Sequence, residues 1–159
     1  MHVTLKQTRE EELARLTEIK TEAFDVQAKY FEDGVLPPFP EDETLDLLFR
    51  KPDITVLSVW VEDEIAGGVV IKRMDDVSNE IMLFFIAVKY QGRGVGRAVL
   101  QMVEARFPQT KRWRLITPTQ VLRNSVFYVN KCGYNIVRVE DFDKRTEHGI
   151  FVFEKRMAD

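Results

Sequence analysis

The spacing of apolar residues changes several times along the chain, and each change predicts a secondary-structure element. Residues 3–8 alternate between apolar and polar, which is typical of a strand. Apolar residues then recur at helical spacing to about residue 28, and Thr8 with Glu11 fits a capping box at the start of this helix. A loop with Gly34 and three prolines separates it from a second, short helix expected over residues 41–50.

The pattern over the rest of the chain predicts six strands and two helices. The strands are expected over residues 54–61, 65–74, 80–88, 112–117, 134–142 and 149–157, and the helices over 95–107 and 121–134. Residues 81–88 are apolar without alternation, which predicts a strand buried on both faces. The resulting order is β-α-α-β-β-β-α-β-α-β-β, so we expect a single α/β domain over residues 1–159.

Composition narrows the class of protein. The chain has 159 residues, of which 45% are hydrophobic and 31% charged, as in a soluble globular domain. The single cysteine, Cys132, excludes an internal disulfide, and the apolar run at 81–88 is far below the ~20 residues of a membrane helix. The N-terminus lacks the apolar core of a signal peptide, so we expect a cytoplasmic protein with no membrane partner. The histidines, His2 and His148, suggest no metal pair, and no metal is expected.

The net charge of −3 argues against nucleic acid as a partner, but the charges are unevenly distributed. Residues 21–46 contain eight acidic residues and one basic residue, whereas residues 89–114 contain seven basic residues and one acidic residue. The first segment could attract a cation and the second an anion. Two solvent-exposed faces whose charges differ by chance would give the same counts.

A glycine-rich turn, "QGRGVG" at residues 91–96, lies between a predicted strand and a predicted helix. Glycines permit positive φ, and the free N–H groups of such a turn and of the helix start form an anion site. Arg93 and Arg97 could add charge-assisted hydrogen bonds. The dinucleotide fingerprint G-x-G-x-x-G fails, because Arg97 or Val99 stands at the third glycine position, and no Gly-Lys-Ser/Thr follows for a Walker loop. A glycine turn without a ligand is the alternative interpretation.

Two motifs carry a family resemblance. Gln91, Gly94 and Gly96 match the pattern Q/R-x-x-G-x-G/A, and "FFIAVKYQGRGVG" resembles the strand and acetyl-coenzyme A loop of the GCN5-related N-acetyltransferase (GNAT) superfamily. "FYVNKCGY" is similar to that family's later F-Y-x-x-x-G-F/Y motif. The order of predicted elements also resembles the family's fold, which implies a mixed, mostly antiparallel sheet flanked by about four helices.

The resemblance implies acetyl-coenzyme A as cosubstrate. Its pyrophosphate should bind the main chain of residues 91–96, and its pantetheine arm should follow strand 81–88 and bond to the main chain near Phe84 and Ile86. Asn124 lies one helical turn before Tyr128, although the family's common asparagine position holds Val121 in this chain. The predicted cofactor-binding residues are Phe84, Phe85, Ile86, Gln91, Gly92, Arg93, Gly94, Val95, Gly96, Arg97 and Asn124.

The same resemblance assigns two catalytic residues. Tyr128 matches the family's general acid, which would protonate the departing thiolate, and Glu80 resembles the general base of the histone-acetylating members. A strand N–H near Phe84 would stabilise the oxyanion. A packed aromatic and a solvent-facing carboxylate are the structural alternatives for the two side chains. The chain shows no Cys/His constellation for a thiol nucleophile, which favours direct transfer.

The acceptor is expected to be a small-molecule primary amine. Acids and the aromatic residues Phe24, Tyr30, Phe31 and Phe39 accompany the loop between the first two helices, and both attract a protonated amine, although the aromatics are also typical of a core. Alternative functions are a non-catalytic acetyl-coenzyme A sensor or partner-binding module, an acyltransferase for a protein or peptide N-terminus, and transfer of a longer acyl group. A homodimer is possible, with the last strand, residues 150–157, pairing with a neighbour.

Overall fold

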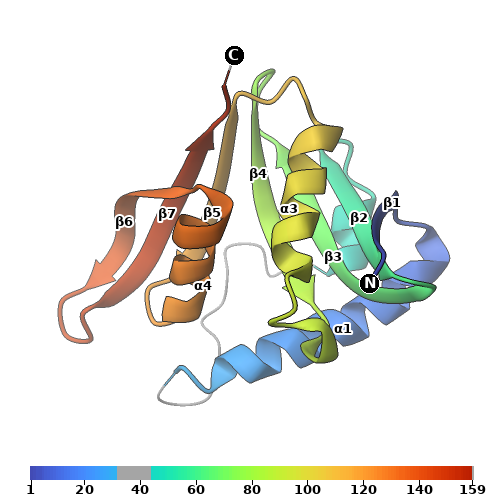
Figure 1. Cartoon of the computed structure of the whole chain (residues 1–159). Coiled ribbons are helices and arrows are strands. Elements are labelled where there is room, and N and C mark those ends of the chain that lie inside the picture. Colours follow the sequence, from blue (N-terminus) through green and yellow to red (C-terminus); the bar gives the residue numbers. More distant parts are fainter. Residues whose placement is uncertain (32–43, 159) are drawn as a thin grey trace.

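The computed structural model describes residues 1–31 and 44–158, which form a seven-stranded sheet flanked by helices (Figure 1). The strands are β1 (Val3–Gln7), β2 (Ile54–Val61), β3 (Glu64–Arg73), β4 (Ser78–Ile86), β5 (Arg112–Pro118), β6 (Asn135–Asp143) and β7 (His148–Arg156). The helices are α1 (Leu13–Ala28), α2 (Leu45–Phe49), α3 (Val95–Arg106) and α4 (Leu122–Val126), which continues into a π-helical turn at Phe127–Lys131. The predicted α/β fold class and order of elements are confirmed.

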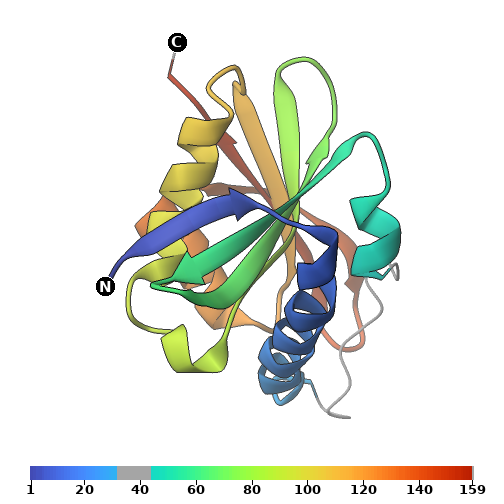
Figure 2. The same cartoon turned by 90° about the vertical axis from the view of Figure 1, so that its right-hand side faces the viewer.

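Helices cover both faces of the sheet. Figure 2 shows α3 on one side and α1 with α2 on the other. Leu16 and Ile19 of α1 pack with Leu45 and Leu48 of α2 against one face, because both helices present an apolar stripe there. On the other face the apolar stripe of α3 packs with Trp113, Tyr128, Tyr134 and Phe153, which are among the largest buried side chains. The sheet therefore separates two apolar layers, and one of them holds the predicted general acid.

The strand order is β1-β2-β3-β4-β5-β7-β6, and every neighbouring pair is antiparallel except β4 with β5. The parallel pair is short, since it joins only residues 78–80 to 112–114. Beyond it β4 continues beside β3 to Ile86, and β5 continues beside β7 to Pro118. The two strands thus diverge into a V, visible in Figure 1, whose opening is flanked by α1 and α4.

The first helix begins differently from the prediction. Thr8 is buried, and its hydroxyl hydrogen-bonds the Ser58 hydroxyl of β2 at 2.7 Å instead of capping the helix. A 3-10 turn, Glu10–Glu12, leads into α1; its N-cap is Arg9, whose N–H donates to Glu12 Oε1 at 2.8 Å, and Glu12 is the N-cap of α1 itself. The capping box is therefore displaced by one residue, to Arg9 and Glu12 in place of Thr8 and Glu11. The Thr8 hydroxyl is not available to cap the helix, because it hydrogen-bonds to the distant strand β2. The predicted helix at 41–50 is confirmed as α2 over its described part, with Thr44 as N-cap, while residues 41–43 lie outside the described residues.

Two further predictions about strands are wrong. β4 is not buried on both faces along its length, since Met82, Leu83 and Phe84 are half-buried beside the V-shaped opening. β7 cannot pair with a neighbouring molecule, because β5 and β6 occupy its two edges. The strand at that edge of the sheet is β6, which is exposed along most of its length and interrupted by two bulges. Within the described part of the chain, no helix is long and apolar enough to cross a membrane.

Candidate active site

The glycine turn joins β4 to α3 at the open end of the V. Gly92 has φ 72° and Gly94 has φ 82°, and Gly94 is the N-cap of α3. A Cβ atom at either position would meet nothing within 4 Å, so conformation rather than space requires glycine there. At Gly96 a Cβ would lie 3.1 Å from Phe127 Cζ, so this glycine allows α3 to approach the π-helical turn closely. The turn is therefore open to solvent and presents main-chain N–H groups at a helix N-terminus.

Side chains hold this turn in place. Gln91 Nε2 donates to the carbonyl oxygen of Ile86 at 2.9 Å, which ties the turn to the end of β4. Arg123 Nη2 of α4 donates to Gln91 Oε1 at 3.2 Å. The guanidinium of Arg93 lies 5.7 Å from the ring centroid of Tyr90, within the range of a cation–π contact. One glutamine side chain thus connects the turn, β4 and α4.

A cavity of about 450 Å³ lies between the glycine turn, β4, α1 and α4. Nine of the eleven predicted cofactor-binding residues line it: Phe84, Phe85, Ile86, Gln91, Gly92, Gly94, Gly96, Arg97 and Asn124. Of the other two, Arg93 is exposed beside Tyr90, and Val95, the first residue of α3, is buried in the core. Among the described residues that line the cavity, Arg97, Arg123 and Lys131 are basic and none is acidic. The cavity is therefore suited to an anionic ligand.

The inner wall of the cavity is the edge of β4. The N–H of Ala87 donates to the carbonyl of Ala66 at 2.7 Å, on the β3 side. Because main-chain groups alternate in direction along a strand, those of Phe84 and Ile86 face the opposite side, toward β5. No described strand pairs with them there, since the β4–β5 ladder ends at Glu80. An extended ligand can hydrogen-bond to such an edge as an added strand would.

Tyr128 lies in the π-helical turn and lines the cavity. Its ring packs against those of Phe127, Tyr134 and Phe153, with centroids 5.1, 5.9 and 5.6 Å away. Burial raises the pKa of the Tyr128 phenol far above its usual range, so the hydroxyl stays protonated and able to donate. The arrangement places a neutral proton donor at the wall of the cavity.

Asn124 and Tyr128 both line the cavity, as their spacing on the helix predicted. Val121, at the spacing of the family's common asparagine, is fully buried in the core, so that position offers the cavity no side chain. Asn124 therefore stands in the more suitable place, because the start of α4 rather than the loop before it faces the opening.

A second, smaller cavity of about 50 Å³ lies deeper in the V, between β4 and the end of β5. It shares five lining residues with the larger cavity: Phe24, Gln27, Phe84, Asn124 and Tyr128. Phe24 was predicted near the acceptor, and its ring stacks edge-on against Phe85 at 6.4 Å. Tyr30 is instead exposed, beside Lys29, and Phe39 lies outside the described residues.

Glu80, the predicted base, lies where β4 and β5 are still paired. Strand register places it in one row with Lys72 of β3, Arg114 of β5 and Glu154 of β7, so charges of alternating sign cross four strands on one face. Glu80 is half-buried and lines neither cavity among the described residues. Phe84 is four residues further along, which is about 13 Å of strand. The structure thus brings Tyr128 to the cavity but not Glu80.

Sequence reasoning missed several lining residues. Gln27 comes from α1, Tyr90 from the turn after β4, and Arg123 and Lys131 from the α4 region. Gln27 follows Phe24 by three residues and so shares its helix face, which was the one local signal available for it. Tyr90 directly precedes the glycine turn, whereas Arg123 and Lys131 meet the cavity only through the long-range packing of α4 against that turn.

The comparisons with known proteins agree with this geometry. Residues 14–134 match the model of the acetyltransferase (GNAT) family. YrkN, an uncharacterized protein of Bacillus subtilis, is 31% identical over 137 residues, which cover 85% of this chain and 74% of that protein. An acetyltransferase from Thermus thermophilus has a similar structure, with a TM-score of 0.78 at 17% identity over 99% of this chain and 98% of its own. The PaiA N-acetyltransferase from Thermoplasma acidophilum, solved in complex with coenzyme A, has a TM-score of 0.69 at 19% identity over 99% of this chain and 100% of its own.

Proposed function

The chain belongs to the GNAT family of acetyltransferases, which are acyl-coenzyme A N-acyltransferases, and we propose that it transfers an acetyl group from acetyl-coenzyme A directly to a small-molecule primary amine. One observation carries the proposal. The open glycine turn, the unpaired edge of β4 and the buried phenol of Tyr128 line a single cavity. Residues 1–159 are proposed to act as one transferase domain, since β1 and β7 belong to the same sheet.

The diphosphate of the cosubstrate is proposed to bind the main-chain N–H groups of residues 91–96. Three features support this placement: positive φ at Gly92 and Gly94, open space above both, and the N-terminus of α3 directly after them. Arg97 lines the cavity within the first turn of that helix and supplies a charge-assisted hydrogen bond. Arg93 and Val95 are proposed to contribute through their main chain, because their side chains lie elsewhere.

The pantetheine arm is proposed to run along β4. Its two amide groups match in kind the main-chain groups of Phe84 and the N–H of Ile86, whose carbonyl already accepts from Gln91 Nε2. Residue identity matters little for such bonds. Phe85 contributes its side chain, since its main chain faces β3. Asn124 is proposed to hydrogen-bond the same arm from α4, because it faces both cavities. The thioester then lies between Phe84 and Tyr128.

The transfer proceeds by attack of the neutral amine nitrogen on the thioester carbon. A C–N bond forms, and the carbonyl oxygen becomes an oxyanion that the N–H of Phe84 stabilises. The C–S bond then breaks, and the thiolate of coenzyme A takes a proton from the phenol of Tyr128. The proton lost by the amine returns the phenol to its neutral form through solvent, so that atoms and charge balance. The products are the acetylated amine and free coenzyme A.

We propose that water, rather than Glu80, removes the proton from the amine. No carboxylate or histidine is among the described residues that line either cavity. Glu80 lies beside Lys72 and Arg114 in the charged row, at the paired end of β4. This placement supports a structural role in holding β3, β4 and β5 together.

The experiment combines calorimetry with a thiol-release assay. The protein should bind coenzyme A, and acetyl-coenzyme A with a panel of primary amines should release thiol in proportion to acetylated product identified by mass spectrometry. Absence of coenzyme A binding would overturn the whole proposal. Binding without turnover of any amine would instead favour the sensor function that the sequence left open.

A further inference from the structure

We infer that Lys155 is a positioning residue for Tyr128: its ammonium group caps the helical turn that carries the phenol and ties this turn to α3. The inference rests on the proposed function, because it assigns a second residue to the proton donor of the transfer. Three features of the structure support it: the end of the π-helical turn, the contacts of the Lys155 side chain, and the place of α3 in the proposed cosubstrate site.

Tyr128 lies in a turn of unusual geometry. The helix that begins at Leu122 widens into a π-helical turn at Phe127–Lys131, and Cys132 is the C-cap of this turn. Such turns are rare and occur frequently at functional sites. The last carbonyl groups of a helix have no partner within it, so the end of this turn needs a donor from elsewhere. The direction of the Tyr128 side chain depends on the turn keeping its width, because losing one residue from it would rotate its two ends by about 100° relative to each other.

The side chain of Lys155 supplies that donor. Its Nζ donates to the carbonyl oxygen of Cys132 at 2.8 Å and to Glu104 Oε1 and Oε2 at 2.8 and 3.0 Å. These contacts match the three donors of an ammonium group in number, and a cation at the C-terminal end of a helical turn is favourable for its dipole. The side chains of Lys155 and Glu104 are only 23% and 13% exposed, so solvent screens this pair far less than a surface pair. One ammonium group therefore holds the end of the turn, four residues after Tyr128.

The same strand also contacts the ring of Tyr128. Phe153 and Lys155 are two residues apart on β7 and therefore project from the same face of the sheet. The Phe153 ring packs against that of Tyr128, with centroids 5.6 Å apart, and the Tyr134 N–H donates to the Tyr128 carbonyl at 3.0 Å. β7 thus contacts the ring through one side chain and the end of the turn through the next side chain on that face.

Glu104 connects this arrangement to the proposed cosubstrate site. It lies on α3, the helix whose N-cap, Gly94, belongs to the glycine turn. The ion pair with Lys155 therefore joins the turn that carries the acid to the helix that is proposed to bind the diphosphate. Lys155 itself lines neither cavity, so its effect on the transfer must pass through the residues that it holds.

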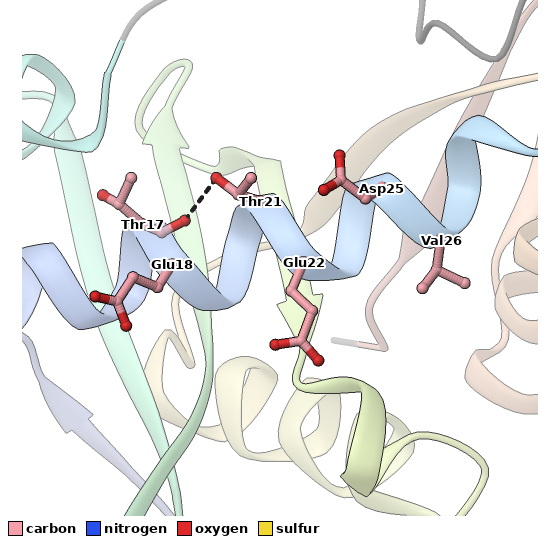
Figure 3. A pocket seen from close by; sticks show the side chains of 6 residues that line it. All are labelled: Thr17, Glu18, Thr21, Glu22, Asp25 and Val26. Carbon is pink, nitrogen blue, oxygen red and sulfur yellow. Dashed lines mark hydrogen bonds between the residues drawn. The ribbon is translucent and has the colours of Figure 1, made fainter.

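The charged side chains on the outer side of α1, which also lines the cavity, offer a contrast. Glu18, Glu22 and Asp25 are exposed along a shallow groove on that side of the helix (Figure 3). Glu18 pairs with Arg15 at 3.0 Å, and their side chains are 69% and 50% exposed. An exposed ion pair contributes little to stability or to the geometry of a site. Glu18→Gln is therefore the matched control for breaking the buried pair.

The test is a double-mutant cycle of Lys155→Met and Tyr128→Phe in the thiol-release assay, with the amine of the panel that gives the highest turnover. Misplacing a reacting group by about 1 Å costs up to ~10²-fold in rate, so Lys155→Met should lower kcat ~10- to 100-fold and leave coenzyme A affinity within about threefold. In the Tyr128→Phe background the same change should lower kcat by less than about threefold, since residues that act as a unit are not additive. An equal fold loss in both backgrounds, or no loss in either, overturns the inference.

Two controls separate positioning from stability and from charge. Leu57→Ala removes a buried side chain of β2, two strands from β4, and should lower stability by a comparable amount but leave kcat within about threefold. Glu18→Gln should also leave kcat within about threefold. A kcat loss in either control equal to that in Lys155→Met contradicts the inference. If circular dichroism shows that Lys155→Met does not fold, Lys155→Gln, which also removes the charge, replaces it in the cycle with the same expected result.

A measurement without turnover distinguishes failure of the inference from failure of the proposed function. If no amine is acetylated, or if Tyr128→Phe is fully active, the proposed function or its acid has failed, and the position of the ring decides. The chain has four tyrosines, so the NMR ring resonances of Tyr128 are assigned in tyrosine-labelled protein by their loss in Tyr128→Phe. Lys155→Met should shift these resonances, because the ring moves relative to Phe127 and Phe153, whereas Leu57→Ala should not. Unshifted Tyr128 resonances in Lys155→Met overturn the inference.

Discussion

Replacing Tyr128 by phenylalanine removes one hydroxyl group and keeps the aromatic ring in its contacts. The three neighbouring ring centroids lie 5.1–5.9 Å away, and phenylalanine retains these contacts. We therefore expect the free energy of unfolding to change by less than ~1 kcal/mol. Loss of a positioned general acid should lower kcat about 10²–10⁴-fold, which corresponds to about 3–5 kcal/mol of transition-state stabilisation. Affinity for coenzyme A should change little.

The pH dependence separates a proton donor from a packed aromatic side chain. A thiol has an ordinary pKa of about 8.5, so its thiolate must gain a proton to leave at pH 7 but is stable by itself at higher pH. Burial raises the pKa of Tyr128, so the phenol of the wild-type protein stays protonated throughout this range. The ratio of wild-type to Tyr128→Phe kcat should therefore be largest near pH 7 and shrink as the pH rises toward about 9.5.

Tyr134→Phe is the matched control. Tyr134 is also buried, its ring lies 5.9 Å from that of Tyr128, and its hydroxyl has no hydrogen-bond partner among the described residues. Because this hydroxyl does not line the cavity, its removal should leave kcat unchanged and stability equal or slightly higher. Steady-state thiol release and chemical denaturation measure both variants. A pH-independent ratio for Tyr128→Phe, or an equal loss in Tyr134→Phe, would refute the role as general acid.

Three further predictions each concern the replacement of a single residue. Gly94→Ala should lower the free energy of unfolding by about 1–2 kcal/mol, because φ is 82° at this position, and should weaken coenzyme A binding at least ~10-fold in calorimetry. The control is Gly133→Ala, where φ is 81° but the residue lies outside the cavity, so only the stability should fall. Glu80→Gln should keep kcat within about threefold of wild type at pH 7. A fall in kcat of ~10²-fold or more would show that Glu80 acts as the general base. Lys155→Met should lower the free energy of unfolding by about 2–3 kcal/mol, because Lys155 Nζ donates to Glu104 at 2.8 Å and to the Cys132 carbonyl at 2.8 Å in a largely buried setting. The control is Arg15→Met, which breaks an exposed ion pair and should cost less than about 0.5 kcal/mol. A loss as small as this in Lys155→Met would contradict the prediction.

Local sequence patterns predicted most of the elements and the position of the glycine turn. Period-two and helical spacing are set by residues a few positions apart, so β2, β3, α1 and α3 could be located without tertiary information. The requirement for glycine at Gly92 and Gly94 is also local, since it arises from φ rather than from neighbours. The family resemblance then predicted nine cofactor-binding residues of the cavity lining, and Tyr128 beside them.

Contacts between residues far apart in the chain could not be predicted from local sequence patterns. The Thr8 hydroxyl bonds a residue 50 positions away, so no local pattern could show that it would not cap α1. The divergence of β4 from β5 depends on where two distant strands stop pairing, and this exposes Phe84 and lowers the burial of β4. Glu80 looked suited to acid–base chemistry by its spacing, but only the register of four strands places it in a charged row.

The most direct test of the central claim is an NMR titration of the amide-labelled protein with coenzyme A. Binding of the diphosphate by main-chain amides predicts that the largest shifts fall on the N–H groups of residues 91–96, with a second group at Phe84 and Ile86 along β4. A bound coenzyme A that shifts amides elsewhere and leaves the glycine turn unchanged would contradict the account.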